Sequence, residues 1–153
     1  IQIPLIAAGG IATGKGMLAA MVLGADGVQI GSRFVASEES SAHINFKNKV
    51  IEAKDGDTLL TLKELAPVRL LKNKFSNDVL ELYKRNPSKQ DLIDLLGRAR
   101  AKRGMFEGDL EDGELEIGQI TGLINKIQPA SAIINEIIAE FNFEKENLKD
   151  FVF

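Results

Sequence analysis

Residues 3–11 read IPLIAAGGI, a short and almost continuous apolar run that ends in two adjacent glycines, Gly9 and Gly10. An apolar run of this length without polar alternation is typical of a strand buried on both faces, as in parallel sheets. Pro4 is compatible with such a strand because it falls among its first residues. The stretch therefore predicts a buried β-strand over residues 3–8 that ends in a glycine turn.

A second strand of the same kind follows after one helix. Residues 17–23 carry apolar residues and alanines on several faces, as a packed helix does, and Gly24 stands where a C-capping glycine belongs. Residues 28–30 then form a short strand that ends at Gly31. Strand, helix and strand within about 30 residues make one βαβ unit, so we expect parallel strands and a right-handed crossover.

The two glycine turns are the candidate functional site. In parallel α/β folds, ligands bind at the carboxyl ends of the strands. A glycine there lets the backbone approach an anion, and the N–H groups of the turn and the following helix supply donors. We predict a phosphate site formed by the backbone N–H groups of Gly9, Gly10, Gly31 and Ser32, together with the Ser32 hydroxyl. The alternative is that the glycines only make tight turns.

The rest of the chain is predicted to be mostly helical. We expect helices over residues 40–53, 73–85, 88–102, 118–127 and from Pro129 onward, with a capping box formed by Ser88 and Asp91. Residues 58–62 fit a short strand or an extended segment, residues 68–71 are ambiguous, 104–113 fit a loop and 144–153 a polar tail. We divide the chain into parts at 1–54, 55–117 and 118–153.

Composition excludes several classes of function. The net charge of −3 gives no electrostatic support for binding nucleic acid. The absence of cysteine rules out disulfides, thiolate metal sites and cysteine nucleophiles, and it fits a reducing cytoplasm. Because His43 is the only histidine, no metal site is expected. No apolar run reaches the roughly 18 residues of a membrane span.

The sequence does not begin with Met, and it opens inside an apolar run. A strand without any preceding segment is an unusual start for a domain. We therefore expect the 153 residues to be a fragment whose missing part lies on the N-terminal side.

The sequence resembles the nitronate monooxygenase family, whose superfamily includes the FMN-dependent enoyl-acyl-carrier-protein reductases. The resemblance runs with gaps from residue 3 to about residue 142. It is carried by residues 3–11 and 23–34, and further by ESSAH at 39–43, GDL at 108–110 and GQITGL at 118–123. Glycine-rich strand ends are shared by many phosphate-binding barrels, and their ordered combination with the GQITGL segment is more specific.

The resemblance implies an α/β fold, the C-terminal portion of an FMN-binding TIM (β/α)8 barrel followed by a mostly helical, lid-like region. Residues 3–8 would be strand 7 and residues 27–31 strand 8. The residues implied to contact FMN are Gly9, Gly10, Gln29, Ile30, Gly31 and Ser32. Gln119 and Gly122 would lie on a possible active-site segment. No catalytic residue is expected in this chain, because the family's catalytic histidine would lie before strand 7.

The implied reaction of the intact protein is the FMN-dependent oxidation of alkyl nitronates with O2. The alternative within the superfamily is NAD(P)H-dependent reduction of an enoyl thioester. Two further alternatives remain, an inactive fragment and a phosphate-ester-binding barrel without flavin, such as an isomerase. The expected partner is a small-molecule substrate, and a homodimer is possible.

Four other features of the sequence have a structural explanation, and for Arg33 a functional alternative stays open. His43 is expected to cap or pack a helix, and Arg33 to bind the phosphate or form a salt bridge. The basic run is read as a solvated helix face balanced by nearby acids, and the isoleucine stripe near residues 133–138 as core. The residues of the basic run are Arg98, Arg100, Lys102 and Arg103.

Overall fold

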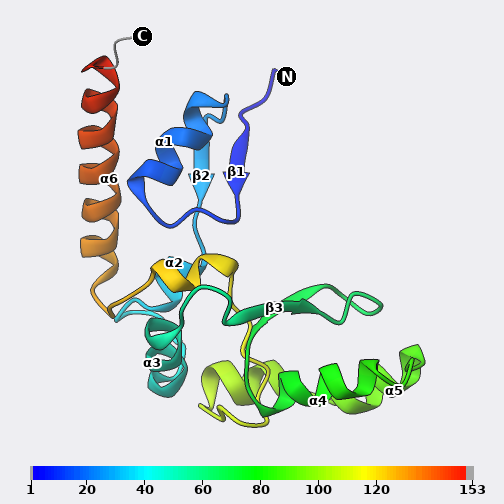
Figure 1. Cartoon of the computed structure of the whole chain (residues 1–153). Helices are drawn as coiled ribbons and strands as arrows, with labels where there is room; N and C mark the ends of the chain where they lie inside the picture. Colours follow the sequence, from blue (N-terminus) through cyan, green and yellow to red (C-terminus); the bar gives the residue numbers. More distant parts are fainter. Residues whose placement is uncertain (1, 151–153) are drawn as a thin grey trace. The chain divides into compact units, whose positions relative to one another are not determined.

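The computed structural model describes residues 2–150 (Figure 1). Contacts divide the chain into two compact units. The first unit contains the residues up to 40 and from 126 onward, and the second contains residues 41–125. The chain thus leaves the first unit after residue 40 and returns to it with its last long helix. The three-part division expected from sequence stays a prediction.

The first unit contains a parallel strand pair and helices. Its elements are β1 (Ile6–Ala8), α1 (Gly14–Val22), β2 (Gly27–Gln29), α2 (Ser32–Val35), α6 (Ala130–Asn147) and the 3-10 turn η3 (Leu148–Asp150). β1 and β2 are parallel neighbours, with Ala7 opposite Val28, and α6 runs beside α1 (Figure 1). The predicted strand–helix–strand order with parallel strands is confirmed.

A glycine and a reciprocal hydrogen-bonded pair define the turn between α1 and β2. Gly24 follows the last turn of α1 with φ +104, a left-handed conformation that favours glycine. Asp26 then forms a reciprocal pair with Leu5. The Asp26 N–H donates to the Leu5 carbonyl and the Leu5 N–H donates to Asp26 Oδ2, both at 2.7 Å. This pair sets the register in which β2 starts beside β1.

The prediction that the first strand is buried on both faces is wrong for this chain. The side chains of Ile3 and Ile6 are 71% and 52% exposed. The strand has one hydrogen-bonded neighbour among residues 2–150, which is β2. An apolar run shows that a strand is suited to burial, but other elements must supply the cover.

The second unit combines an antiparallel hairpin with helices. Its elements are α3 (Ile44–Glu52), β3 (Thr58–Thr61), β4 (Val68–Leu71), α4 (Lys74–Tyr83), α5 (Lys89–Leu96), the π-helix η1 (Lys102–Phe106) and the 3-10 helix η2 (Gln119–Leu123). Leu59 lies opposite Leu70, and Leu70 also bridges to Glu116 on its other side. Residues 55–117 thus combine helices with the β3–β4 hairpin, and their description as a mostly helical lid stays a prediction.

The helix boundaries follow the local capping signals. α5 begins with the predicted capping box, in which the Ser88 hydroxyl accepts from the Asp91 N–H and the Asp91 carboxylate accepts from the Ser88 N–H. It ends at Leu96 because Gly97 adopts φ +65, so the helix predicted to residue 102 is too long. α3 begins at Ile44, four residues later than expected.

Three further predictions from sequence are corrected by the observed helices. The π-helix occupies part of the loop expected at 104–113, where Gly104 is buried and a Cβ would lie 2.6 Å from the Glu114 carbonyl oxygen. The helix expected over 118–127 is a 3-10 helix of five residues. α6 continues to Asn147, so residues 144–147 are not a polar tail, and residues 151–153 of that tail lie outside the described residues.

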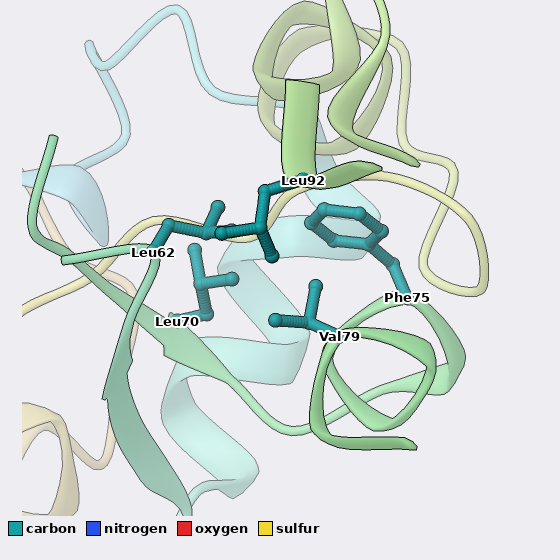
Figure 2. Packing of buried hydrophobic residues seen from close by; sticks show 5 residues of the cluster. All are labelled: Leu62, Leu70, Phe75, Val79 and Leu92. Atoms are coloured by element: carbon teal, nitrogen blue, oxygen red, sulfur yellow. The ribbon is translucent and has the colours of Figure 1, made fainter. Parts of the chain in front are cut away.

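The second unit has its own hydrophobic core. Side chains from the hairpin, α4 and α5 meet in a buried cluster of Leu62, Leu70, Phe75, Val79 and Leu92 (Figure 2). Each of these five side chains is at most 2% exposed. Among the described residues, no helix combines the length and apolar character needed to cross a membrane.

Candidate phosphate site

The strand register places the two glycine turns at the same edge of the parallel pair. Ala8 and Gln29 are the last paired residues of β1 and β2. Gly9 and Gly10 follow directly after Ala8, while Ile30 and Gly31 follow Gln29. Because the strands are parallel, both turns leave from the carboxyl end of the sheet, which is where α/β folds bind ligands. The predicted pairing of the two turns is thus present in the fold.

The Gly9–Gly10 turn needs glycine for its backbone conformation. Gly9 has φ +89 and Gly10 has φ +73, a region that residues with a Cβ rarely adopt. A Cβ built on either residue would meet nothing within 4 Å. The space beside the turn is therefore open, and no side chain of the described residues fills it.

Gly31 differs, because nothing within the described residues 2–150 requires glycine at this position. Its φ of −105 and ψ of −66 belong to the region that ordinary residues adopt. A Cβ at this position would also meet nothing within 4 Å. The tight-turn explanation accounts for Gly9 and Gly10, but it leaves Gly31 unexplained.

The turns offer backbone donors. Among residues 2–150, the N–H groups of Gly10 and Gly31 form no hydrogen bond with another group of the chain. Both residues are exposed. Gln29 is exposed at the end of β2, Ile30 is half-buried, and Ser32 begins α2. The arrangement suits an anion that accepts hydrogen bonds from two turns at once.

The start of α1 is capped by the chain itself. The Thr13 hydroxyl accepts from the Gly16 N–H at 3.1 Å, and Glu140 Oε2 accepts from the Gly14 N–H at 2.7 Å. Two of the donors that a helix N-terminus presents are therefore occupied. The expectation that this helix N-terminus supplies donors to a phosphate is corrected, and the turns before α1 and α2 remain.

Arg33 forms a salt bridge with the last long helix. Its side chain is 9% exposed, and Nη2 lies 2.8 Å from Glu136 Oε2. Glu136 also accepts hydrogen bonds from Lys126 and from Gln128, the latter at 2.8 Å. These contacts lower the pKa of Glu136, with the Lys126 hydrogen bond as the largest cause. Of the two readings of Arg33, the structure contains the salt bridge.

Gln119 and Gly122 belong to the second unit. Gln119 begins the 3-10 helix η2 and is exposed. Gly122 packs closely on the loop after α3, since a Cβ there would lie 3.0 Å from the Asp55 nitrogen. This contact gives Gly122 a structural reason to be glycine. Their role as an active-site segment stays a prediction.

His43 has the helix-capping role expected from sequence. Its Nδ1 accepts from the Asn45 N–H at 3.1 Å at the start of α3. Its own N–H donates to the Met105 carbonyl at 2.7 Å, and the ring packs on Gly108, where a Cβ would lie 2.2 Å from Nδ1. The imidazole is thus held as part of the packing between α3 and the π-helix.

The basic run is only partly a solvated face. Lys102 pairs with Glu107 at 3.0 Å, as the balance of charges predicted. Arg100 instead binds three backbone carbonyls and lies over the Phe75 ring at 4.5 Å. The three acceptors are Leu95, Leu96 and Asp112, at 2.9, 2.7 and 2.7 Å. Arg100 closes the C-terminal end of α5, which the charge pattern could not indicate.

Sequence analysis missed the acidic side of the first unit. Glu136 and Glu140 of α6 reach residues that follow the two glycine turns, Arg33 and Gly14. A signal was present, because glutamates stand four residues apart at 136, 140 and 144 and so share one helix face. Their partners lie more than 100 residues earlier in the chain, which the spacing does not reveal.

A parallel strand pair with a crossover helix and glycine turns at its carboxyl edge places the chain among the α/β proteins. Comparison with known families identifies the particular group. The family model for nitronate monooxygenase matches residues 1–140, and the chain belongs to this family.

Curated relatives and solved structures agree with this assignment. A probable nitronate monooxygenase of Staphylococcus saprophyticus is 34% identical over 143 residues, which cover 93% of this chain and 40% of that protein. The structure of FabK from Thermotoga maritima superimposes with a TM-score of 0.88 and 41% identity, covering 99% of this chain and 48% of that one. A nitroalkane oxidase from Streptomyces ansochromogenes gives 0.76 and 28%, covering 96% and 42%.

The matched relatives are longer than this chain. The chain spans about two fifths of the curated relatives and about half of the FabK structure. The family assignment therefore rests on the part that contains the glycine turns, the hairpin unit and the last helix.

Proposed function

We propose that the intact protein is an FMN-dependent oxidoreductase and that this chain holds the phosphate of the cofactor. The strands β1 and β2 then correspond to strands 7 and 8 of a (β/α)8 barrel, whose loops frequently form the phosphate site. Family membership supports the cofactor. The two turns at one edge of the sheet support its place.

Gly31 carries the proposal. Neither its backbone angles nor its surroundings within the described chain call for glycine. A phosphate close to the turn would call for it, because a Cβ would separate the anion from the Gly31 N–H. The N–H of Gly10, which has no hydrogen-bond partner within residues 2–150, belongs to the turn at the same sheet edge and would supply a second donor of the kind that phosphates accept.

The residues of this chain bind and orient the cofactor. FMN, when bound, supplies the redox chemistry, while the protein determines where the flavin lies and what reaches it. Gly9, Gly10, Gly31 and Ser32 would hold the phosphate, and Gln29 and Ile30 would lie beside it at the end of β2. Arg33 takes no direct part, since its guanidinium is bound to Glu136.

The first candidate reaction is the oxidation of alkyl nitronates with O2. The nitronate monooxygenase family model covers most of the chain, and curated relatives with that name are 33–34% identical. The nitroalkane oxidase structure, at 28% identity, is compatible with substrates of the same class.

Reduction of an enoyl thioester by NAD(P)H is the second candidate, and one observation favours it. The FabK structure is 41% identical over 99% of this chain, a higher identity than that of the nitronate-related proteins above. A reductase of this kind needs the same phosphate site, so the two candidates differ in the substrate and not in the role of the glycine turns.

A test of the phosphate site uses the protein in its full natural length and the variant Gly31→Val. We expect the apo-protein to keep its thermal midpoint, since the side chain meets no clash and no strained φ. FMN affinity, followed by the quenching of flavin fluorescence, should fall at least about tenfold through the loss of charge-assisted hydrogen bonds. Gly16→Ala in α1 is the control, because its Cβ makes only ordinary contacts at 3.5 Å.

Activity assays on the same full-length protein separate the two candidate reactions. Oxygen consumption with an alkyl nitronate supports the first candidate, and enoyl-thioester-dependent oxidation of NAD(P)H supports the second. A Gly31→Val variant with unchanged FMN affinity contradicts the assignment of the turn. A wild-type protein that binds no FMN contradicts the proposed cofactor itself.

A further inference from the structure

Carboxylates on one face of α6 contact the segments that follow both glycine turns. Glu136, Glu140 and Glu144 follow one another at four-residue spacing on α6, so they lie along one face of the helix. Each contacts the α/β part of the first unit, and α6 runs beside α1 (Figure 1). Their partners are Arg33, Gly14 and Lys15, which differ in exposure and in their distance along the chain from the glycine turns.

Glu136 holds the segment after the second turn. Arg33 lies two residues beyond Gly31, and its buried guanidinium donates to Glu136 at 2.8 Å across 103 residues of sequence. The base of α6 is tied to the same segment, since the Glu38 N–H donates to the Gln128 carbonyl at 3.1 Å. The pair fixes the orientation of the Arg33 guanidinium, because a buried arginine without its carboxylate partner would bear an uncompensated desolvation cost.

Glu140 holds the segment after the first turn. Its Oε2 accepts the Gly14 N–H at 2.7 Å, a contact between residues 126 apart in sequence. The helices approach closely at this point, since a Cβ on Gly14 would lie 2.2 Å from the Phe141 nitrogen. The Glu140 carboxylate is thus part of the packing of α1 on α6. Its partner Gly14 lies four residues after Gly10.

Glu144 ends the row without reaching a turn. Its Oε1 lies 3.0 Å from Lys15 Nζ, and the lysine side chain is 65% exposed. The Glu144 side chain is 22% exposed, and a pair with one solvent-exposed partner contributes little to stability. Glu144 therefore offers a matched position on the same helix face for comparison.

We infer that Glu136 and Glu140 are positioning residues, which fix the geometry of the two glycine turns and thereby set the affinity for the phosphate of the cofactor. The inference rests on the proposed function. α6 contacts the segments that follow both turns, in addition to the connection that β1, α1 and β2 provide. The backbone N–H groups of the two turns are therefore positioned relative to the same helix. Neither glutamate is assigned a contact with the cofactor.

The test compares FMN with riboflavin, which lacks the phosphate, on the protein in its full natural length. Glu140→Ala removes the acceptor for the Gly14 N–H, and we expect FMN to bind about tenfold more weakly while riboflavin binding is unchanged. Glu140→Gln retains an acceptor oxygen and should restore most of the FMN affinity. Glu144→Gln is the control and should leave both affinities as in the wild type. A general loss of packing would weaken both flavins together, so this ratio separates positioning from mere stability.

Glu136→Gln gives an independent measurement and replaces Glu140→Ala if that variant does not fold. It removes the charge that faces Arg33 while retaining the oxygen, and it should lower the ratio of FMN to riboflavin affinity. The positioning role is overturned if both variants keep the wild-type ratio of FMN to riboflavin affinity. That outcome includes the case in which the two affinities fall by the same factor. A wild-type protein that prefers neither flavin instead contradicts the proposed phosphate site.

Discussion

Glu114 is a buried carboxylate whose charge the fold disfavours. Its side chain lies in the second unit, where the residue is 6% exposed. Burial raises the pKa of Glu114 to about 7, repulsion from Glu116 adds to the shift, and Arg100 offsets part of it. The folded protein therefore binds a proton at this site more tightly than the unfolded chain, whose carboxyl has the ordinary pKa of 4.5.

This residue makes stability fall as the pH rises. The favourable difference is complete below the unfolded pKa and is lost between about pH 4.5 and 7, because over this range the unfolded carboxyl ionises while the folded one still holds its proton. We expect Glu114→Gln to stabilise the protein by about 1–3 kcal/mol at pH 8 and to change little at pH 4. Urea unfolding of both proteins at several pH values measures this difference.

The control for this prediction is an exposed glutamate. Glu81 pairs with Lys84 on α4, and its side chain is 64% exposed. Glu81→Gln should shift the unfolding free energy by only a few tenths of a kcal/mol, with little pH dependence. If Glu114→Gln behaves like Glu81→Gln at pH 8, the burial of the Glu114 charge has no energetic consequence and the prediction is wrong.

Among elements, the approach of α1 to α6 depends on the absence of one side chain. A Cβ on Gly14 would lie 2.4 Å from the Ile137 carbonyl oxygen and equally close to the backbone at Phe141. Backbone atoms cannot move aside as a side chain tip can, so the helices would have to separate. We expect Gly14→Ala to destabilise the protein by about 2–4 kcal/mol despite the better helix propensity of alanine.

Thermal unfolding of Gly14→Ala and Gly16→Ala provides the measurement. Both glycines lie in the first turn of α1, but a Cβ on Gly16 meets only ordinary contacts, the nearest at 3.5 Å. Gly16→Ala should therefore be neutral or stabilising, by up to about 1 kcal/mol. Equal midpoints for the two variants would show that the close helix approach is not required in solution.

The same elements show which parts of the fold the sequence can predict. The capping box of Ser88 and Asp91 and the strand–turn boundaries at Gly9 and Gly31 depend on neighbours within a few residues, and they were predicted. The pairing of Glu140 with Gly14 and the hydrogen bond from the His43 N–H to the Met105 carbonyl of the π-helix join residues far apart in the chain. Local patterns contain no information about such partners.

The candidate site divides in the same way. Its glycines were found from sequence because strand ends and glycine conformations are local properties. The exposed state of Ile6 was not foreseen, since an apolar run does not reveal which elements cover it. The supporting carboxylates of α6 were missed because their partners are brought together only by the fold.

At the scale of the whole molecule, the two units differ in how well they bury their apolar residues. The first unit exposes Ile3, Leu5 and Ile6 at its strand pair by 49–71%. The second unit closes a cluster of five side chains that are each at most 2% exposed (Figure 2). Its hairpin is further stabilised by the Leu71 N–H, which donates to the Leu115 carbonyl at 2.9 Å.

We therefore expect the segment of residues 41–125 to fold by itself. It has a core, capped helices and a closed set of hairpin contacts, and its length exceeds the roughly 60 residues at which single domains become marginal. Chemical denaturation of the isolated segment, followed by circular dichroism, should show one cooperative transition. Phe75→Ala should abolish it or lower the free energy of unfolding by about 3–5 kcal/mol, since the ring is 1% exposed within the core cluster.

The exposed Leu80 supplies the matched control for this segment. Its side chain is 43% exposed on α4, so Leu80→Ala should change the free energy of unfolding by less than about 1 kcal/mol. A segment that shows helical signal but no cooperative transition would mean that the second unit requires the remainder of the chain to hold its core. A cooperative transition that Phe75→Ala weakens and Leu80→Ala leaves intact would establish that residues 41–125 form an independently folding domain.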